Sequence, residues 1–104
     1  MPLLTRGVII AEMIKSFRCK ETQGIFERRH SRRFAHFQEI ALRKLLLIET
    51  ATVLDDIRIP PANRLEKLKG NRAGQYSIRI NDQWRICFEW HDGYAVRVEI
   101  VDYH

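Results

Sequence analysis

Apolar side chains recur at spacings of three and four residues in the middle of the chain, and they are Phe34, Phe37, Ala41, Leu45 and Ile48. This spacing places them on one face of an α-helix. Ser31 stands just before the pattern, at a position where a helix N-cap is expected. The sequence therefore predicts an amphipathic helix that begins near Ser31 and packs on a sheet.

The segments on either side of this helix show weaker patterns. Residues 14–18 alternate between apolar and polar side chains, which predicts a short half-buried strand, and residues 21–29 resemble a short helix. Residues 55–70 contain the pair Pro60-Pro61, through which neither a helix nor a strand continues easily. We interpret this stretch as a long connection, and long connections often carry function.

The last third of the chain predicts three consecutive strands, at residues 76–80, 84–90 and 94–101. Turn-forming residues separate them at positions 81–83 and 91–93, so the strands should form an antiparallel meander.

The apolar faces of these strands predict their register. With three residues in both loops, Ile78 lies opposite Ile86, and Ile86 lies opposite Val98. A two-residue second loop would instead set Ile86 against Glu99 and turn the apolar side chains of one strand to the wrong face. We therefore prefer the three-residue loops.

The preferred register places Arg79, Arg85 and Glu99 side by side on the sheet face opposite the core. Two guanidinium groups beside one carboxylate leave spare positive charge, and the planar guanidinium fork matches phosphate oxygens. This face is either a phosphate site or a solvated surface with an ordinary cross-strand ion pair, and the pattern alone leaves both readings open.

The composition fits one folded, basic domain. The chain has 104 residues, and its 18 Lys and Arg against 13 Asp and Glu give a formal net charge of +5. Such an excess is typical of proteins that bind polyanions. Cys19 and Cys87 lack the spacing of a metal site or a disulfide framework, so we expect free thiols in a reducing cytoplasm. The apolar run near the N-terminus is too short for a signal peptide or a membrane span.

The residues with catalytic chemistry favour neither a metal nor a nucleotide cofactor. The histidines show no metal-ligand spacing, and the glycines form no phosphate-binding loop. The chain ends with Asp102, Tyr103 and His104, three groups that can transfer protons, although composition alone favours a frayed terminus. Metal-free RNA cleavage stays possible because RNA supplies its own nucleophile, the 2′-hydroxyl group.

From Met13 to His104 the chain resembles HigB toxins of the RelE superfamily, and in particular the HigB/GraT type. The motifs that carry the resemblance are Met13-Ile14-Lys15-Ser16-Phe17, Asn63-Arg64-Leu65-Glu66, Gly70-Asn71-Arg72-Ala73-Gly74, Ser77-Ile78-Arg79, Trp84-Arg85 and Asp102-Tyr103-His104. Residues 1–12 lie outside the resemblance. Either they are a real extension of the single domain, or translation starts at Met13. We favour the second alternative.

The resemblance implies an α+β fold, with an N-terminal strand and two helices packed on a curved, mostly antiparallel sheet. It also implies a toxin of a type II toxin-antitoxin system that cleaves messenger RNA in the ribosomal A site. A helix-turn-helix antitoxin of the HigA type would neutralise the toxin and connect it indirectly to operator DNA. No membrane partner is implied.

Carried over residue by residue, the resemblance assigns catalytic positions to Lys69, Arg85, Asp102, Tyr103 and His104. We add the RNA-binding candidates Arg64, Arg72 and Arg79. The expected reaction is metal-independent attack of the 2′-hydroxyl on the adjacent phosphate. Glu66 departs from the family pattern, since some members have histidine there, and this leaves the identity of the principal base open.

Two other functions remain as alternatives. A ParE-like gyrase inhibitor would share the superfamily fold, but it makes no use of the terminal triplet together with Lys69 and Arg85. A non-catalytic RNA-binding module would explain the charge without clustered acid and base groups. RNA that is cut at defined sites, rather than bound and left intact, distinguishes the predicted nuclease from the binding module.

Overall fold

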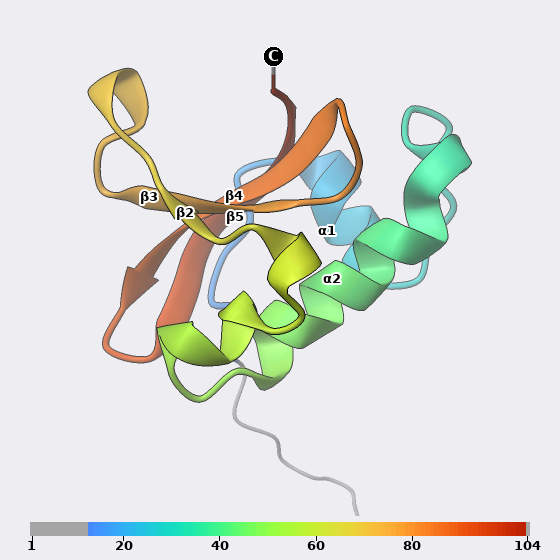
Figure 1. Ribbon diagram of the computed structural model, residues 1–104. Coiled ribbons are helices and arrows are strands. Elements are labelled where there is room, and N and C mark those ends of the chain that lie inside the picture. The colour runs from blue at the N-terminus through green and yellow to red at the C-terminus, as the bar shows by residue number, and fades with distance from the viewer. Residues whose placement is uncertain (1–12, 104) are drawn as a thin grey trace, which may run out of the picture.

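The computed structural model describes residues 13–103. The expectations for residues 1–12 and for His104 therefore lie outside the described residues. The helices and strands are α1 (Lys20–Phe26), α2 (Gln38–Thr50), β2 (Glu66–Lys67), β3 (Gln75–Arg79), β4 (Trp84–His91) and β5 (Tyr94–Asp102). The strands form one antiparallel sheet in the order β2-β3-β4-β5 (Figure 1). This arrangement confirms the predicted α+β fold.

The predicted apolar stripe is confirmed, whereas the predicted start of its helix is wrong. All five stripe residues are at most 8% exposed. The α-helix begins at Gln38, however, and a 3₁₀ turn at Ala35–Phe37 precedes it. The hydroxyl of Ser31 still accepts a hydrogen bond, from the backbone N–H of Phe34 at 3.2 Å, so it caps a turn ahead of the helix rather than the helix itself.

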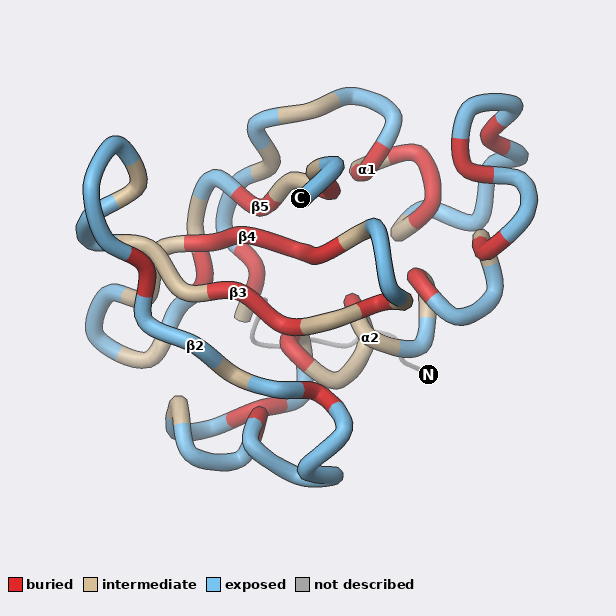
Figure 2. Tube along the Cα trace, turned by 45° about the horizontal axis from the view of Figure 1, so that its top comes forward, coloured by how far each residue is buried: buried red, intermediate tan, exposed pale blue. Residues whose placement is uncertain are grey.

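The core lies between α2 and one face of the sheet. Isoleucines 78, 86 and 100, from β3, β4 and β5, are each at most 3% exposed and join the stripe of α2 in one apolar cluster. Figure 2 shows a buried stretch in β4, and this stretch is residues 85–88. Because side chains alternate between the faces of a strand, the residues next to these isoleucines point to the opposite face.

The N-terminal segment forms less regular structure than predicted. Ile14 and Phe17 form isolated parallel bridges to Ala95 and Val98 of β5, but no continuous strand. The backbone N–H of Arg97 donates to the hydroxyl of Ser16 at 2.9 Å instead of to a backbone carbonyl. The backbone ladder is thus interrupted where β5 is irregular.

The register predicted for the last two strands is wrong. His91 pairs with Tyr94, so the turn holds two residues, Asp92 and Gly93, with φ angles of 52° and 87°. A β-bulge follows, where Arg97 has a φ of 53°. The bulge adds one residue to β5, and this restores the apolar faces that a two-residue turn would otherwise exchange.

As a result, Ile86 lies opposite Ile100, and Cys87 lies opposite Glu99. The predicted pairing of Ile78 with Ile86 between β3 and β4 is confirmed.

The proline-containing connection is held in place by a buried amide. It contains 3₁₀ turns at Leu54–Arg58 and Pro61–Asn63. The side-chain N–H groups of Asn63, which is 0% exposed, donate to the carbonyls of Ile57 and Ile59, both at 3.1 Å. Its oxygen accepts a hydrogen bond from Lys44, and burial lowers the pKa of that amine. Arg64, the next residue, thereby has a fixed backbone position.

Candidate active site

Arg85 lies on the sheet face opposite the core, because its neighbour Ile86 points into the core. The residue is 8% exposed. Its Nε donates to the hydroxyl oxygen of Ser77 at 2.8 Å, and one terminal nitrogen donates to the backbone carbonyl of Arg64 at 2.6 Å. These bonds fix the guanidinium plane before any ligand arrives.

The charge of Arg85 is only partly neutralised by its surroundings. The carboxylate of Glu66, on β2, lies 3.8 Å from a terminal nitrogen, and the Glu66 side chain is 50% exposed. At that distance and exposure, solvent screens the ion pair strongly. A buried guanidinium with one distant, solvated counter-charge favours the binding of an anion.

A pocket of about 550 Å³ opens beside this guanidinium. We call it the arginine pocket, and it is lined by Ala62, Arg64, Arg79, Asn81, Asp82, Arg85 and Tyr103. The guanidinium carbon of Arg85 lies 5.6 Å from the ring centre of Tyr103, a distance typical of a cation–π contact. Arg79 forms an ion pair with Asp82 at the rim. The pocket thus combines cations that can bind a phosphate with an aromatic face on which a base can stack.

The arginine pocket brings together four of the predicted site residues, namely Arg64, Arg79, Arg85 and Tyr103. Asp102 does not line it. In the register of β4 and β5, Asp102 lies opposite Trp84, and Trp84 packs toward the core. The carboxylate of Asp102 accepts a hydrogen bond from the side chain of Gln83 at 3.0 Å. His104 lies outside the described residues.

Lys69 and Arg72 lie in a different region, near the loop that precedes β3. Lys69 is exposed and stands at the start of the 3₁₀ turn Gly70–Arg72. Arg72 donates to Gln75 at 3.0 Å and forms an ion pair with Glu99 at 3.2 Å. The predicted row of Arg79, Arg85 and Glu99 is therefore wrong in its third member, because the bulge moves Glu99 away from Arg85.

Sequence reasoning attached no role to Ser77, although this residue fixes Arg85. Ser77 is 0% exposed and lies on the same sheet face as Arg85. Ser77 alternates with Gln75 and Arg79 on the polar face of β3, so its residue type and position do not mark it as buried. The carbonyl of Arg64 could not have been found either, because its position depends on the fold of the whole connection.

Cys87, the strand partner of Ser77, is not a candidate nucleophile. Burial raises the pKa of its thiol to about 11, so the thiol stays protonated near neutral pH. Within residues 13–103, no three His, Cys, Asp or Glu side chains gather in a way that could hold a metal ion. No helix in that range is long and apolar enough to cross a membrane.

The fold of this chain is similar to that of two solved bacterial structures. A chain of the YoeB–YefM complex from Staphylococcus aureus matches with a TM-score of 0.52 and 21% sequence identity, and the match covers 88% of this chain and 97% of that one. The structure of the YoeB dimer from the same organism gives a TM-score of 0.51 at 21% identity. At this identity the likeness shows the fold.

The chain belongs to the HigB-like toxin family, the RelE-like toxins of type II toxin-antitoxin systems, and the family match spans residues 15–104. Toxin HigB-1 of Vibrio cholerae serotype O1 is 38% identical over 86 residues, which cover 81% of this chain and 90% of the relative. Endoribonuclease HigB of Proteus vulgaris is 33% identical over 93 residues, which cover 88% of this chain and 100% of the relative. The resemblance read from the sequence motifs is thereby confirmed.

Proposed function

We propose that this toxin is an endoribonuclease that cleaves messenger RNA in the A site of the ribosome. The observation that carries the proposal is the arginine pocket, where a guanidinium fixed by Ser77 and Arg64 faces an open space beside Tyr103. The relative from Proteus vulgaris is itself named an endoribonuclease. A pocket of this kind suits a phosphodiester, because its cations are in place before negative charge develops in the transition state.

The proposed reaction uses the RNA's own 2′-hydroxyl as the nucleophile. Its oxygen attacks the adjacent phosphorus in line with the departing 5′-oxygen. The products are a 2′,3′-cyclic phosphate and a free 5′-hydroxyl. Arg85 stabilises the charge on the phosphoryl oxygens, and Arg79 and Arg64 hold the neighbouring backbone. Tyr103 stacks on a base.

Two proton transfers complete this reaction, since the 2′-hydroxyl loses a proton and the 5′-oxygen gains one. We assign them to Asp102 and His104 at the C-terminus. Asp102 does not line the arginine pocket, and its carboxylate accepts a hydrogen bond from Gln83. The assignment therefore requires the Asp102 carboxylate to reach the RNA from outside the pocket. Glu66 is a third candidate for proton transfer, because its carboxylate lies 3.8 Å from the Arg85 guanidinium that would hold the phosphate. Lys69 and Arg72 would contribute general attraction for the RNA.

The partners follow from the same proposal. A ribosome would present the messenger RNA to the arginine pocket in the cytoplasm. A HigA-type antitoxin would neutralise the toxin and bind operator DNA on its behalf. A toxin with the same fold has been solved as a YoeB–YefM complex, which supports a protein antitoxin as partner.

Mapping messenger RNA 5′ ends after brief induction tests the proposal. Wild-type protein should create new 5′-hydroxyl ends at fixed positions within codons, and Arg85→Ala should create none. The new ends should disappear when the antitoxin gene beside the toxin gene is expressed. Growth arrest without new RNA ends, or DNA damage in place of RNA cleavage, would refute the nuclease and favour a gyrase inhibitor.

A second assay tests the metal-free chemistry. Cleavage should persist in excess EDTA on ribosome complexes that have been cross-linked beforehand, so that loss of magnesium cannot dissociate them. Abolished cleavage under these conditions would refute metal-independent attack.

A further inference from the structure

A second pocket lies on the other side of the turn between β3 and β4. It has a volume of about 510 Å³ and is lined by Arg33, His36, Phe37, Trp84 and the turn residues 81–83. We call it the aromatic pocket. None of these lining residues belongs to the catalytic set proposed above.

The walls of the aromatic pocket are rings with a cation above them. Trp84 packs against Phe34 and Phe37, with ring centres 5.4 and 5.5 Å apart. The guanidinium carbon of Arg33 lies 4.9 Å from the ring centre of Phe34 and 5.9 Å from that of Trp84. Arg33 is exposed, whereas Trp84 is half-buried. The pocket therefore offers the partly exposed ring of Trp84 next to the exposed planar cation of Arg33.

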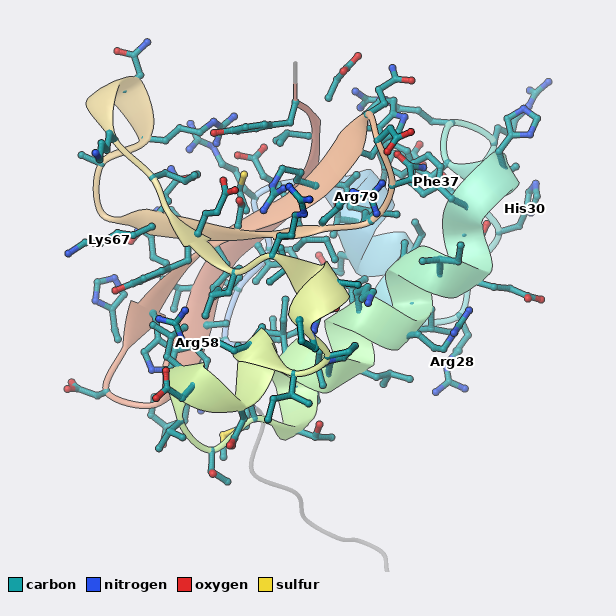
Figure 3. All side chains as sticks on the ribbon, viewed as in Figure 1. Arg28, His30, Phe37, Arg58, Lys67 and Arg79 are labelled. Atoms are coloured by element: carbon teal, nitrogen blue, oxygen red, sulfur yellow. The ribbon has the colours of Figure 1, made fainter. Side chains whose placement is uncertain are left out.

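The chain leading into this pocket is strongly basic. Six side chains between positions 28 and 36 carry or can carry positive charge, namely Arg28, Arg29, His30, Arg32, Arg33 and His36. All six are exposed, and the labelled His30 points outward in Figure 3. Among the described contacts, the carboxylate of Glu27 pairs with one of them, Arg29. Of the six, Arg33 and His36 line the aromatic pocket, whereas Arg28 and His30 line a separate pocket. Cations beside an aromatic surface suit a ligand that is both aromatic and anionic.

The aromatic pocket adjoins the arginine pocket. Asn81 and Asp82 line both of them, so the turn forms the wall that the two pockets share. The labelled side chains of Arg79 and Phe37, one from each pocket, lie at the same end of the molecule in Figure 3. A strand of RNA that places one phosphate beside Arg85 can therefore reach the aromatic pocket by crossing this turn.

We infer that the aromatic pocket binds an unpaired nucleobase of the RNA, close to the phosphate in the arginine pocket. This inference rests on the proposed function. The base stacks on Trp84 and is covered by the Arg33 guanidinium, which moves from the rings onto the base. Single-stranded RNA is commonly held in this way, by stacking on aromatic side chains and guanidinium planes. A purely structural role for Arg33, as a lid on the core rings, is the competing explanation.

Fluorescence of Trp84 tests the inference directly. The chain has two tryptophans, so Trp90→Phe leaves Trp84 as the only reporter. The probe is a 2′-O-methyl adenosine hexanucleotide, which lacks the 2′-hydroxyl and cannot be cleaved. It should quench Trp84 with saturation, while inorganic polyphosphate, which has charge but no bases, should bind without quenching. Binding of the oligonucleotide without any change at Trp84 would overturn the inference, and so would absence of binding.

Matched arginine variants separate stacking from charge. Arg32→Ala and Arg33→Ala remove the same charge from adjacent exposed positions, but only Arg33 lines the pocket. Arg33→Ala should weaken oligonucleotide binding by a further factor of about two to five beyond Arg32→Ala, as expected for an exposed cation–π contact. Polyphosphate binding should fall equally in both. Equal losses of oligonucleotide binding, with unchanged thermal unfolding, would leave Arg33 a structural lid and refute its role.

The outcome can be separated from that of the nuclease proposal. Messenger RNA cleavage by wild-type protein, together with an unresponsive Trp84, would refute the aromatic pocket alone. A responsive Trp84 in a protein that never cuts RNA would refute the nuclease and leave a base-binding site.

Discussion

The arginine pocket and the loop at residues 69–74 both contain cations that the sequence assigned to one site, but the two sets of cations differ in burial and in hydrogen bonding. In the pocket, Arg85 is 8% exposed and has two fixed hydrogen-bond partners below 3 Å. In the loop, Lys69 is exposed. The side chain of Arg72 is 34% exposed and forms an ion pair with Glu99. One region orients a guanidinium, and the other offers solvated charge.

The difference teaches what burial contributes to a catalytic cation. A guanidinium held in a buried, hydrogen-bonded position costs free energy to bury, but it needs no reorganisation when a phosphate gains charge. A solvated loop cation attracts RNA through a screened field, and that attraction is similar in the ground state and the transition state. The pocket should therefore control the rate, and the loop should affect mainly binding.

The largest effect should come from removing Tyr103 and His104 together. Cleavage should be abolished, because the ring beside Arg85 and one proposed proton-transfer group are both lost. Stability should fall by only about 1 kcal/mol, since the described part of this change is one backbone hydrogen bond from Tyr103 to Gln83 and a 37% exposed ring. Thermal unfolding and primer extension measure the two effects. Unchanged cleavage by the folded truncated protein would remove the C-terminus from the site.

A smaller effect should come from Ser77→Ala, which removes the acceptor for Nε of Arg85. A hydrogen bond to a charged group contributes about 1.5–3 kcal/mol, so unfolding in urea should reveal a loss in that range. We expect kcat to fall by about tenfold with little change in KM, because Arg85 stays near the phosphate but loses its orientation. Ser77→Thr keeps the hydroxyl and should recover most of kcat. Equal changes in kcat and KM would contradict a positioning role.

Arg72→Ala should have a weaker effect. Its partly exposed ion pair with Glu99 contributes less than about 1 kcal/mol, so stability should hardly change. Cleavage on ribosomes should slow by about twofold to fivefold at low salt, and the difference should fade as salt increases. A salt-independent loss of a hundredfold would place Arg72 in the reaction itself.

The smallest effect on activity should come from a thiol reagent. Cys87 lies between Ser77 and Glu99 in the sheet and is 0% exposed. Since its pKa is raised to about 11, the thiolate is scarce at pH 8 and becomes common only as the pH rises toward 11. Iodoacetamide at pH 8 should therefore modify Cys19 alone and leave cleavage intact, as mass spectrometry can show. Rapid modification of Cys87 in the native protein would mean that the sheet between the two regions opens.

These regions also show how far the sequence can be interpreted. The stripe of α2 and the three C-terminal strands were predictable, because each depends on local periodicity. The bulge at Arg97 was not predictable, because two arrangements keep Ile86 opposite an apolar residue. One is a three-residue turn without a bulge, and the other is the observed two-residue turn with a bulge after it. That single choice decided whether Glu99 accompanies Arg85 or Arg72.

The two-residue strand β2 was also beyond prediction, because so short a segment has no periodicity. Its Glu66 nevertheless brings a carboxylate to Arg85 from a distant part of the chain. Of the pocket residues, Arg79 was found from the predicted strand register, and Tyr103 was found through the resemblance to HigB toxins. The contacts that orient Arg85 depend on tertiary packing, so the sequence shows no motif for the residues that make them.

Single-turnover cleavage on programmed ribosomes, at saturating toxin, tests most directly whether the arginine pocket is the site of the reaction. The account predicts that Arg85→Ala lowers the rate by about a hundredfold to a thousandfold, as loss of one preorganised donor does elsewhere. Lys69→Ala should lower it by less than about fivefold, and both variants should still bind ribosomes. A large loss for Lys69→Ala beside a small one for Arg85→Ala would contradict the account and move the reaction to the 69–74 loop.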